Sequence, residues 1–296
     1  MTLNPALDYE VCVDGFHAGE LNRTRREHLH FGGKGVNVST VLHNLGVETM
    51  ALGFVAGFTG RALEQGLAAA GIPTDFVRLE EGATRINVKI RSGGETEING
   101  RGPAIPQEAL EALFRKLERL TEGDALVLAG SLPAGLPGDV YRRILAHMEG
   151  RGVLTVVDAA RDLLRGTLPH RPFLIKPNTA ELAELFDRDA LTGDEILSCA
   201  RTLQEQGARN ILVSMAGDGS LLLDEDGVPH RLGVPPGSVR HTVGAGDSMV
   251  AGFLAGWLKY QDYDAAHRMG AAAGSATAFS DGLATGAEIR ALLPAL

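Results

Sequence analysis

Short apolar segments alternate with amphipathic segments along this chain, and this alternation constrains the fold more than any other feature. The buried strands that it predicts are short, apolar and bounded by Gly, Pro or Asp: Met50–Val55, Ala125–Ala129, Val153–Val157, Phe173–Lys176 and Ile211–Met215. Between them, helical spacing predicts helices over Pro106–Thr121 and Thr192–Gln206, the second beginning with a capping box. Such βαβ units predict an α/β fold with a mostly parallel sheet, whose ligands bind beyond the carboxyl ends of the strands.

Two regions depart from this alternation and predict a second, smaller sheet. Thr84–Arg91 alternates strictly between polar and apolar residues, and Glu95–Asn99 can return as its partner after a glycine turn. Near the N-terminus, Tyr9–Val13 and Arg23–His30 predict another pair of strands. We expect a β-lid from about residues 9–30 and 84–100, with a polar, partly basic face that covers a site. An ordinary solvated hairpin explains the same pattern.

Composition narrows the classes of function. The 296 residues carry a net charge of −9, which disfavours a nucleic-acid or anionic-membrane surface. The two cysteines, Cys12 and Cys199, match no metal spacing and no disulfide framework, so a cytoplasmic protein is expected. The sequence contains neither a recognisable signal peptide nor an apolar run long enough to span a membrane.

Two glycine clusters each precede a predicted helix. Gly32, Gly33 and Gly35 lie in "FGGKGVNVSTVLHNLG", where free N–H groups can bind hydroxyl or phosphate oxygens; a tight turn into the helix is the alternative. In "VGAGDSMVAGF" the glycines precede Asp247, and Met249 replaces the third glycine of a dinucleotide fingerprint. This second cluster can form an anion hole beside a carboxylate that accepts a proton, whereas the alternative for Asp247 is a helix N-cap.

Two further motifs are compatible with nucleotide and metal binding. In "IKPNTAEL", Asn178 and Glu181 lie on one side of a first helical turn, where they could hold a hydrated Mg²⁺ or form a capping box. The stretch "VSMAGDGSLL" predicts a glycine-containing hairpin that could enclose a nucleotide or be a plain turn.

Taken together and in order, these motifs resemble the PfkB group of ribokinase-like carbohydrate kinases over nearly the whole chain. The stretches that carry the resemblance are "TLNPALD" (2–8), "GGKGVNVS" (32–39), "TRINVKI" (84–90), "LAGSLP" (128–133), "IKPNTAEL" (175–182), "VSMAGDGS" (213–220) and "TVGAGDS" (242–248). The resemblance implies one kinase domain over residues 1–296, folded as a three-layer α/β/α sandwich with a mostly parallel central sheet and a small β-sheet lid. It also implies ATP and Mg²⁺ as cofactors, and a homodimer formed through the lid.

The resemblance implies a role for each matching residue. Asp247 is expected to be the catalytic base, and the anion hole is expected to comprise Gly244, Ala245 and Gly246. The sugar and its phosphate group are expected to contact Asp8, Gly32, Gly33, Asn37, Arg85, Lys89, Arg101 and Ser131. The expected contacts of ATP are Lys176, Asn178, Ser214, Gly217, Gly219, Gly244, Gly246, Gly274 and Ser275. Asn178 and Glu181 are expected to place Mg²⁺, largely through water.

Within the group, "TLNPALD", "ALGFVAGFTG", "TRINVKI" with "TEING", and "GAGDSMVAGF" are most similar to kinases of ketohexose phosphates. The implied reaction is ATP-dependent phosphorylation of fructose 1-phosphate at its C6 hydroxyl, with tagatose 6-phosphate as the alternative substrate. Two other classes stay open. The missing third glycine disfavours a nicotinamide dehydrogenase, and the retained Asp247 disfavours a non-catalytic sugar-phosphate sensor.

Overall fold

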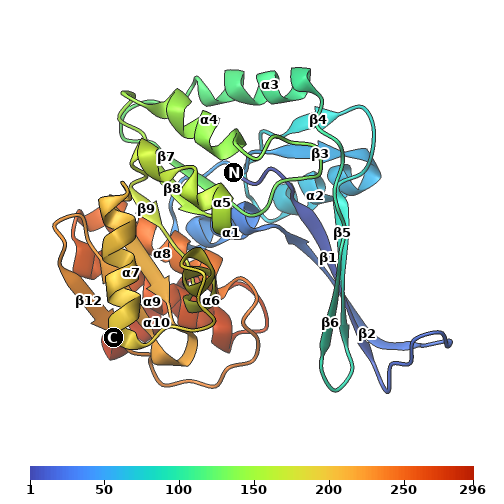
Figure 1. Cartoon of the computed structure of the whole chain (residues 1–296). Coiled ribbons are helices and arrows are strands. Elements are labelled where there is room, and N and C mark those ends of the chain that lie inside the picture. Colours follow the sequence, from blue (N-terminus) through green and yellow to red (C-terminus); the bar gives the residue numbers. More distant parts are fainter.

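The computed structural model describes residues 1–296, and its central layer is a six-stranded sheet (Figure 1). The strands lie in the order β12-β11-β10-β9-β8-β7. Neighbouring strands from β7 to β10 are parallel, whereas β11 and β12 are antiparallel to their neighbours. Their bounds are β7 Ala125–Ala129, β8 Leu154–Asp158, β9 Leu174–Ile175, β10 Asn210–Ser214, β11 Ser220–Leu223 and β12 Pro229–Leu232. The predicted mostly parallel sheet is confirmed.

Helices cover both faces of this sheet because alternate strand residues point to opposite sides. Val157 belongs to one apolar cluster, whereas its neighbour Val156 belongs to the other. The first cluster packs under α3 (Gln107–Leu117), α4 (Val140–Met148), α5 (Arg161–Arg165), α6 (Thr179–Leu185) and α7 (Gly193–Glu205). The second packs under α1 (Lys34–Leu45), α8 (Ala245–Tyr260), α9 (Tyr263–Phe279) and α10 (Gly286–Leu292). The predicted α/β/α sandwich is confirmed, and none of its helices combines the length and apolarity needed to cross a membrane.

The N-terminal segment joins the central sheet to a second, two-stranded sheet. Ala129 N–H donates to the Met1 carbonyl, and Thr2 N–H donates to the Leu52 carbonyl. Beyond this segment lie β3 (Phe54–Ala56) and β4 (Val77–Leu79), with α2 (Gly57–Ala69) between them in sequence. The predicted strand Met50–Val55 is wrong for most of its length. Residues 50–53 meet their neighbours only through isolated bridges, so no ladder forms there.

The lid is a four-stranded sheet that projects from the body (Figure 1). Its strands lie in the order β2-β1-β5-β6, with β1 (Ala6–Val13) parallel to β5 (Arg85–Arg91). The outer strands are β2 (Thr24–Gly32) and β6 (Glu95–Asn99), each antiparallel to its neighbour. The predicted lid sheet is therefore confirmed, and β1 begins earlier than predicted because its first residues pair with the end of β2.

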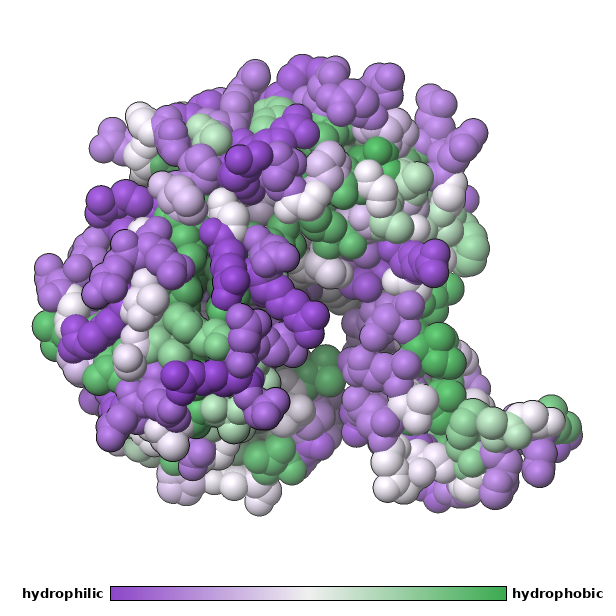
Figure 2. Space-filling view, in the orientation of Figure 1, coloured by the Kyte–Doolittle hydropathy of each residue, from purple (hydrophilic) through white to green (hydrophobic).

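The two faces of the lid differ from those of a solvated hairpin. Asn87, on the polar face, is 7% exposed, whereas Ile86, on the apolar face, is 42% exposed. Figure 2 shows hydrophobic residues running along one side of the lid. A solvated hairpin exposes its polar side, so the burial of Asn87 on that side favours the lid interpretation of this segment.

Candidate active site

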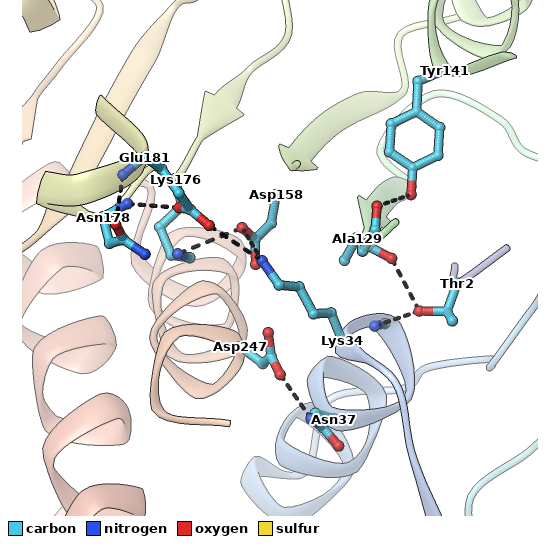
Figure 3. A network of polar contacts seen from close by, with 12 residues as sticks. Thr2, Lys34, Asn37, Ala129, Tyr141, Asp158, Lys176, Asn178, Glu181 and Asp247 are labelled. Carbon is cyan, nitrogen blue, oxygen red and sulfur yellow. Dashed lines mark hydrogen bonds and ion pairs between the residues drawn. The ribbon is translucent and has the colours of Figure 1, made fainter. Parts of the chain in front are cut away.

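A cluster of buried charges lies where the parallel strands end. Asp158 is the last residue of β8, and Lys176 directly follows β9. Lys34, the first residue of α1, completes the cluster, with its Nζ 3.1 Å from Asp158 Oδ1 (Figure 3). Lys176 Nζ lies 3.5 Å from the same oxygen, and Glu181 Oε1 lies 3.8 Å from Lys34 Nζ. Because the carboxyl ends of parallel strands meet at one edge, the fold itself brings these groups together.

The cluster controls its own ionisation. Burial alone would raise the pKa of Asp158, but the ammonium groups of Lys176 and Lys34 hold that pKa below its ordinary value. Burial likewise opposes the charge of Lys34, while Asp158 and Glu181 raise its pKa overall. The buried carboxylate of Asp158 therefore stays ionised between the ammonium groups of Lys34 and Lys176.

Asp247 lies beside this cluster, in the first turn of α8 (Figure 3). The helix begins at Ala245 with Gly244 as its N-cap, so the alternative interpretation of Asp247 as a helix N-cap is wrong. Gly244 has a φ of 78°, which a glycine adopts without strain, and this lets the helix begin earlier than predicted. Burial, with a smaller contribution from Asp158, raises the pKa of Asp247 to about 6.

The start of α8 offers unused hydrogen-bond donors. The N–H groups of Gly246 and Asp247 donate to no group of the chain, whereas Ala245 N–H donates to the Thr242 carbonyl at 3.2 Å. A Cβ at Gly246 would lie 3.2 Å from Lys176 Nζ, so the lysine ammonium lies against this turn. Free N–H groups, the positive end of a helix dipole and an ammonium group together suit an anion. Of the predicted anion hole, Gly246 contributes a free N–H, whereas the N–H of Ala245 is already engaged.

The two glycine motifs meet across α1 and α8. Asn37 Nδ2 donates to Asp247 Oδ2 at 2.7 Å, which joins the two helices close to their N-termini. The glycine motif before α1 is anchored to the N-terminal segment, because Gly35 N–H donates to Thr2 Oγ1 at 2.6 Å. Gly33, the N-cap of α1, has a φ of 106°. These contacts bring Asn37 to the carboxylate of Asp247, one helical turn after Gly33.

The lid contributes the remaining residues close to this site. Asp8, on β1, lies against Gly32, where a Cβ would be only 2.1 Å from Asp8 Oδ2. Arg85, the first residue of β5, donates from Nε to the Asn4 carbonyl at 3.1 Å. Burial lowers the pKa of Arg85, and the nearby carboxylate of Asp8 partly offsets that effect. Asp8, Gly32 and Arg85 thus lie together, as their predicted role in sugar binding requires.

The other predicted phosphate contacts are less well placed. Lys89 is buried, and its Nζ lies 3.5 Å from Glu97 Oε1, so its charge is already paired. Arg101 is exposed, and only its carbonyl is fixed, by Asn4 Nδ2 at 3.1 Å. Ser131 is exposed just beyond β7, at the same edge of the sheet as Asp158.

The predicted metal and nucleotide motifs lie next to each other. Asn178 Oδ1 accepts from Glu181 N–H at 2.8 Å, and Glu181 Oε2 accepts from Asn178 N–H at 2.9 Å, so the capping box is present. Glu181 Oε1 is not used by this box. Asn178 also bridges to Ser214 at the end of β10. The turn from β10 to β11 follows, and it contains Gly217 and Gly219.

The expectation that Gly274 and Ser275 contact ATP needs correction at Gly274. This residue is buried where α9 packs on α8, and a Cβ there would lie 3.2 Å from the Ala245 carbonyl oxygen. Its missing side chain lets the two helices approach closely, which explains the glycine without a ligand. Ser275 is half-buried.

Lys34 and Asp158 lie at the centre of the site, although the sequence motifs predict no role for either residue. Lys34 lies within the first glycine motif, whose predicted contacts involve Gly32, Gly33 and Asn37. Asp158 ends a predicted strand region, and a carboxylate at that point of a parallel sheet is a usable signal.

Comparisons with known proteins identify the family of this chain. A family model described as pfkB family carbohydrate kinase matches residues 3–290. The 1-phosphofructokinase of Bacillus subtilis (strain 168) is 44% identical over 294 residues, which cover 99% of this chain and 96% of that protein. The D-tagatose-1-phosphate kinase of Bacillus licheniformis is 38% identical over 283 residues, covering 95% and 92% respectively. The structure of Arabidopsis thaliana ribokinase complexed with ribose and ATP matches with a TM-score of 0.81 at 20% identity, covering 98% of this chain and 96% of that one.

The chain therefore belongs to the pfkB family of carbohydrate kinases. The match to ribokinase shows a shared fold, so the predicted ribokinase-like class is confirmed. The predicted enzyme class is confirmed as well, and the nicotinamide dehydrogenase alternative loses its support.

Replacing Asp158 with Asn should destabilise the protein by about 3 kcal/mol, because it leaves a buried lysine without its counter-charge. Lys34 is 38% exposed at its side chain and can turn toward water, whereas Lys176 is 4% exposed and cannot. Urea unfolding measures the loss. The double variant Asp158→Asn/Lys176→Met should recover much of it, and a double variant no more stable than the single one would contradict the charge argument.

Proposed function

We propose that this enzyme transfers the γ-phosphoryl group of ATP to the C6 hydroxyl of fructose 1-phosphate, giving fructose 1,6-bisphosphate and ADP. The observation that carries the proposal is the buried Asp247 carboxylate, which lies beside Lys176 and the free N–H groups at the start of α8. The relatives named 1-phosphofructokinase support fructose 1-phosphate as the substrate. The whole chain, residues 1–296, would act as one kinase unit, and its free cysteines fit a reducing compartment such as the cytoplasm.

In the proposed step, the C6 oxygen attacks the γ-phosphorus in line while the bond from that phosphorus to the β–γ bridging oxygen breaks. The hydroxyl proton passes to Asp247, and the electron pair of the broken bond leaves with ADP. A carboxylate with a pKa of about 6 is mostly ionised at neutral pH, and it accepts a proton more readily than an exposed aspartate. No covalent phospho-enzyme is needed.

The transferring phosphoryl group would be held by the N–H groups of Gly246 and Asp247 and by the Lys176 ammonium. Gly244, whose N–H also has no acceptor in the chain, would complete this anion hole. The rest of ATP would lie along the turn from β10 to β11, past Ser214, Gly217 and Gly219. This arrangement stabilises negative charge where the phosphoryl transfer develops it.

The residues present fit a hydrated Mg²⁺. Asp158 Oδ2 is buried without a hydrogen-bond partner, and Glu181 Oε1 is left over from the capping box. Mg²⁺ prefers such oxygens and keeps several waters. Asp158 and Glu181 would therefore hold the ion. Asn178, which was predicted to place the ion together with Glu181, would instead support Glu181, because its Oδ1 already accepts from Glu181 N–H. The ion, when bound, would neutralise charge on the ATP phosphates.

The sugar would lie between the lid and the body. Asp8 and Asn37, with the backbone at Gly32 and Gly33, would contact its hydroxyl groups. Arg85 would bind its phosphate group, because a guanidinium can offer two donors to two phosphate oxygens. Exposed Arg101 and Ser131 can reach an added ligand, whereas Lys89 would first have to leave Glu97.

The test is ADP release from Mg·ATP with product identification, using four sugars side by side. The four are fructose 1-phosphate, tagatose 1-phosphate, tagatose 6-phosphate and fructose 6-phosphate. Fructose 1-phosphate should have the highest kcat/KM of the four. Tagatose 1-phosphate is included because of the relative that carries its name. A clear preference for either tagatose phosphate would replace the proposed substrate. ATP binding without turnover of any of the four would favour a sugar-phosphate sensor.

The acid limb of the pH profile should report Asp247. We expect kcat/KM for the sugar to fall as the pH drops through about 6, because the protonated carboxyl cannot accept the hydroxyl proton. Replacing Asn37 with Leu removes the hydrogen bond that favours the carboxylate, so the limb should move to higher pH. Asp247→Asn should lose about 10²- to 10⁴-fold in kcat.

The matched control for Asn37→Leu is Asn44→Leu, also on α1, since Asn44 donates to the Ala284 carbonyl and not to the site. Its acid limb should stay in place. Normal turnover by Asp247→Asn would rule out its role as the base.

We also propose that two chains pair through the apolar faces of their lids. Leu29 is 50% exposed, Ile86 42% and Ile98 59%, and they gather on one face of the sheet. Pairing would bury this surface and protect the outer strands β2 and β6. In sedimentation, Ile98→Glu should shift a dimer to the monomer, whereas Val228→Glu, on an exposed turn of the body, should not. A wild-type monomer at micromolar concentration would exclude the proposal.

A further inference from the structure

Two oppositely charged side chains of the sugar site lie near each other without forming an ion pair. Asp8 is close enough to influence the pKa of Arg85, and both are partly removed from water. Arg85 nevertheless takes part in no salt bridge, and its one hydrogen bond goes from Nε to the Asn4 carbonyl. In a region of reduced polarity, such groups attract each other strongly. Something in the structure must keep them apart.

The side chain of Asn87 holds the carboxylate of Asp8. Asn87 is 7% exposed, and its Nδ2 donates to Asp8 Oδ1 at 2.7 Å. Its Oδ1 accepts from Gly100 N–H at 3.2 Å, at the point where β6 has ended. A carboxylate can only accept and an N–H can only donate, so the orientation of this amide follows from its partners. The parallel register of β1 and β5 places Asp8 and Asn87 side by side.

The other carboxylate oxygen lies in space left free by a glycine. A Cβ at Gly32 would lie 2.1 Å from Asp8 Oδ2, so only a glycine leaves room for the carboxylate in this position. Asp8 is thus held by the Asn87 amide on one strand and lies against the backbone of Gly32 on the other. Neither neighbour carries a charge.

A second buried amide residue, Asn4, holds the side chain of Arg85. Asn4 is 4% exposed, its carbonyl accepts from Arg85 Nε, and its Nδ2 donates to the Arg101 carbonyl. The two terminal nitrogens of Arg85 are left without a hydrogen-bond partner. Those are the donors that can grip two oxygens of a phosphate group.

We propose that Asn87 is a positioning residue that keeps the Asp8 carboxylate from pairing with Arg85, so that both groups stay available to the substrate. The inference rests on the proposed sugar site, in which Asp8 binds a hydroxyl and Arg85 binds the phosphate group. Without Asn87, Asp8 would turn to Arg85, and each substrate molecule would have to break that ion pair before it could bind.

Asn87→Leu keeps the approximate volume of the side chain and removes the donor. It should raise the KM for fructose 1-phosphate by about 10- to 100-fold, the effect of losing one hydrogen bond to a charged group. The KM for ATP should change little. Asn99→Leu is the matched control, because Asn99 lies opposite Asn87 on β6 and is exposed.

Two readouts separate positioning from a general structural role. In Asn87→Asp two carboxylates face each other, so the KM for the sugar should improve as the pH falls and a shared proton restores the hydrogen bond. In an Arg85→Met background, Asn87→Leu should add little to the KM, because no partner is left for Asp8. Additive effects of the two substitutions, or an equal rise in the KM for ATP, would overturn the inference.

A crystal structure of ligand-free Asn87→Leu tests the inference independently of the reaction. We expect an ion pair between Asp8 and Arg85 in place of the separation seen here. An Asp8 carboxylate that keeps its position against Gly32 would overturn the inference. If the ion pair forms but no sugar phosphate is turned over by the wild-type enzyme, the proposed function fails and the positioning role of Asn87 stands.

Discussion

The ion cluster of Asp158, Lys34 and Lys176 is the interaction on which the rest of the site depends. Removing such charges from water costs several kcal/mol for each ion unless they compensate one another. Their compensation requires β8, β9 and the start of α1 to meet within hydrogen-bonding distance. The same charges act on Asp247, because Asp158 raises its pKa and the lysines lower it. One cluster therefore fixes the packing of three elements and the proton affinity of the neighbouring carboxylate.

The fold could be predicted largely from the sequence because its central layer follows simple periodicities. Strands such as Ala125–Ala129 are continuous apolar runs buried on both faces, and their bounds are as predicted. The segment Met50–Val55 has the same appearance but lacks a continuous partner, and pairing partners are not encoded locally. The N-cap alternative for Asp247 fails because the start of α8 also depends on backbone conformation. The conformation of Gly244, not the residue type at position 247, decides where that helix begins.

The site was predictable where a residue's role depends on its own short motif, and less so where the role depends on distant partners. Asp247 and Gly246 belong to one motif, and the structure brings them next to Lys176. Lys34 and Asp158 are 124 positions apart, so their contact could not be read from either segment alone. Gly274 was expected to contact ATP but is buried between two helices. A glycine in a helix can reflect close packing as readily as space for a ligand.

The residues of the proposed site are distributed between the lid and the body of the protein. Asp8 and Arg85 lie on lid strands, whereas Asp247 and Lys176 lie on the body. The lid strand β1 follows directly from the segment that bridges the two sheets of the body, so one end of the lid is anchored while its tip is free (Figure 1). In the proposed mechanism, a sugar phosphate held by Asp8 and Arg85 on the lid presents its hydroxyl to Asp247 on the body. The substrate itself would then join the two parts of the site, because each part supplies only some of the groups that the reaction needs.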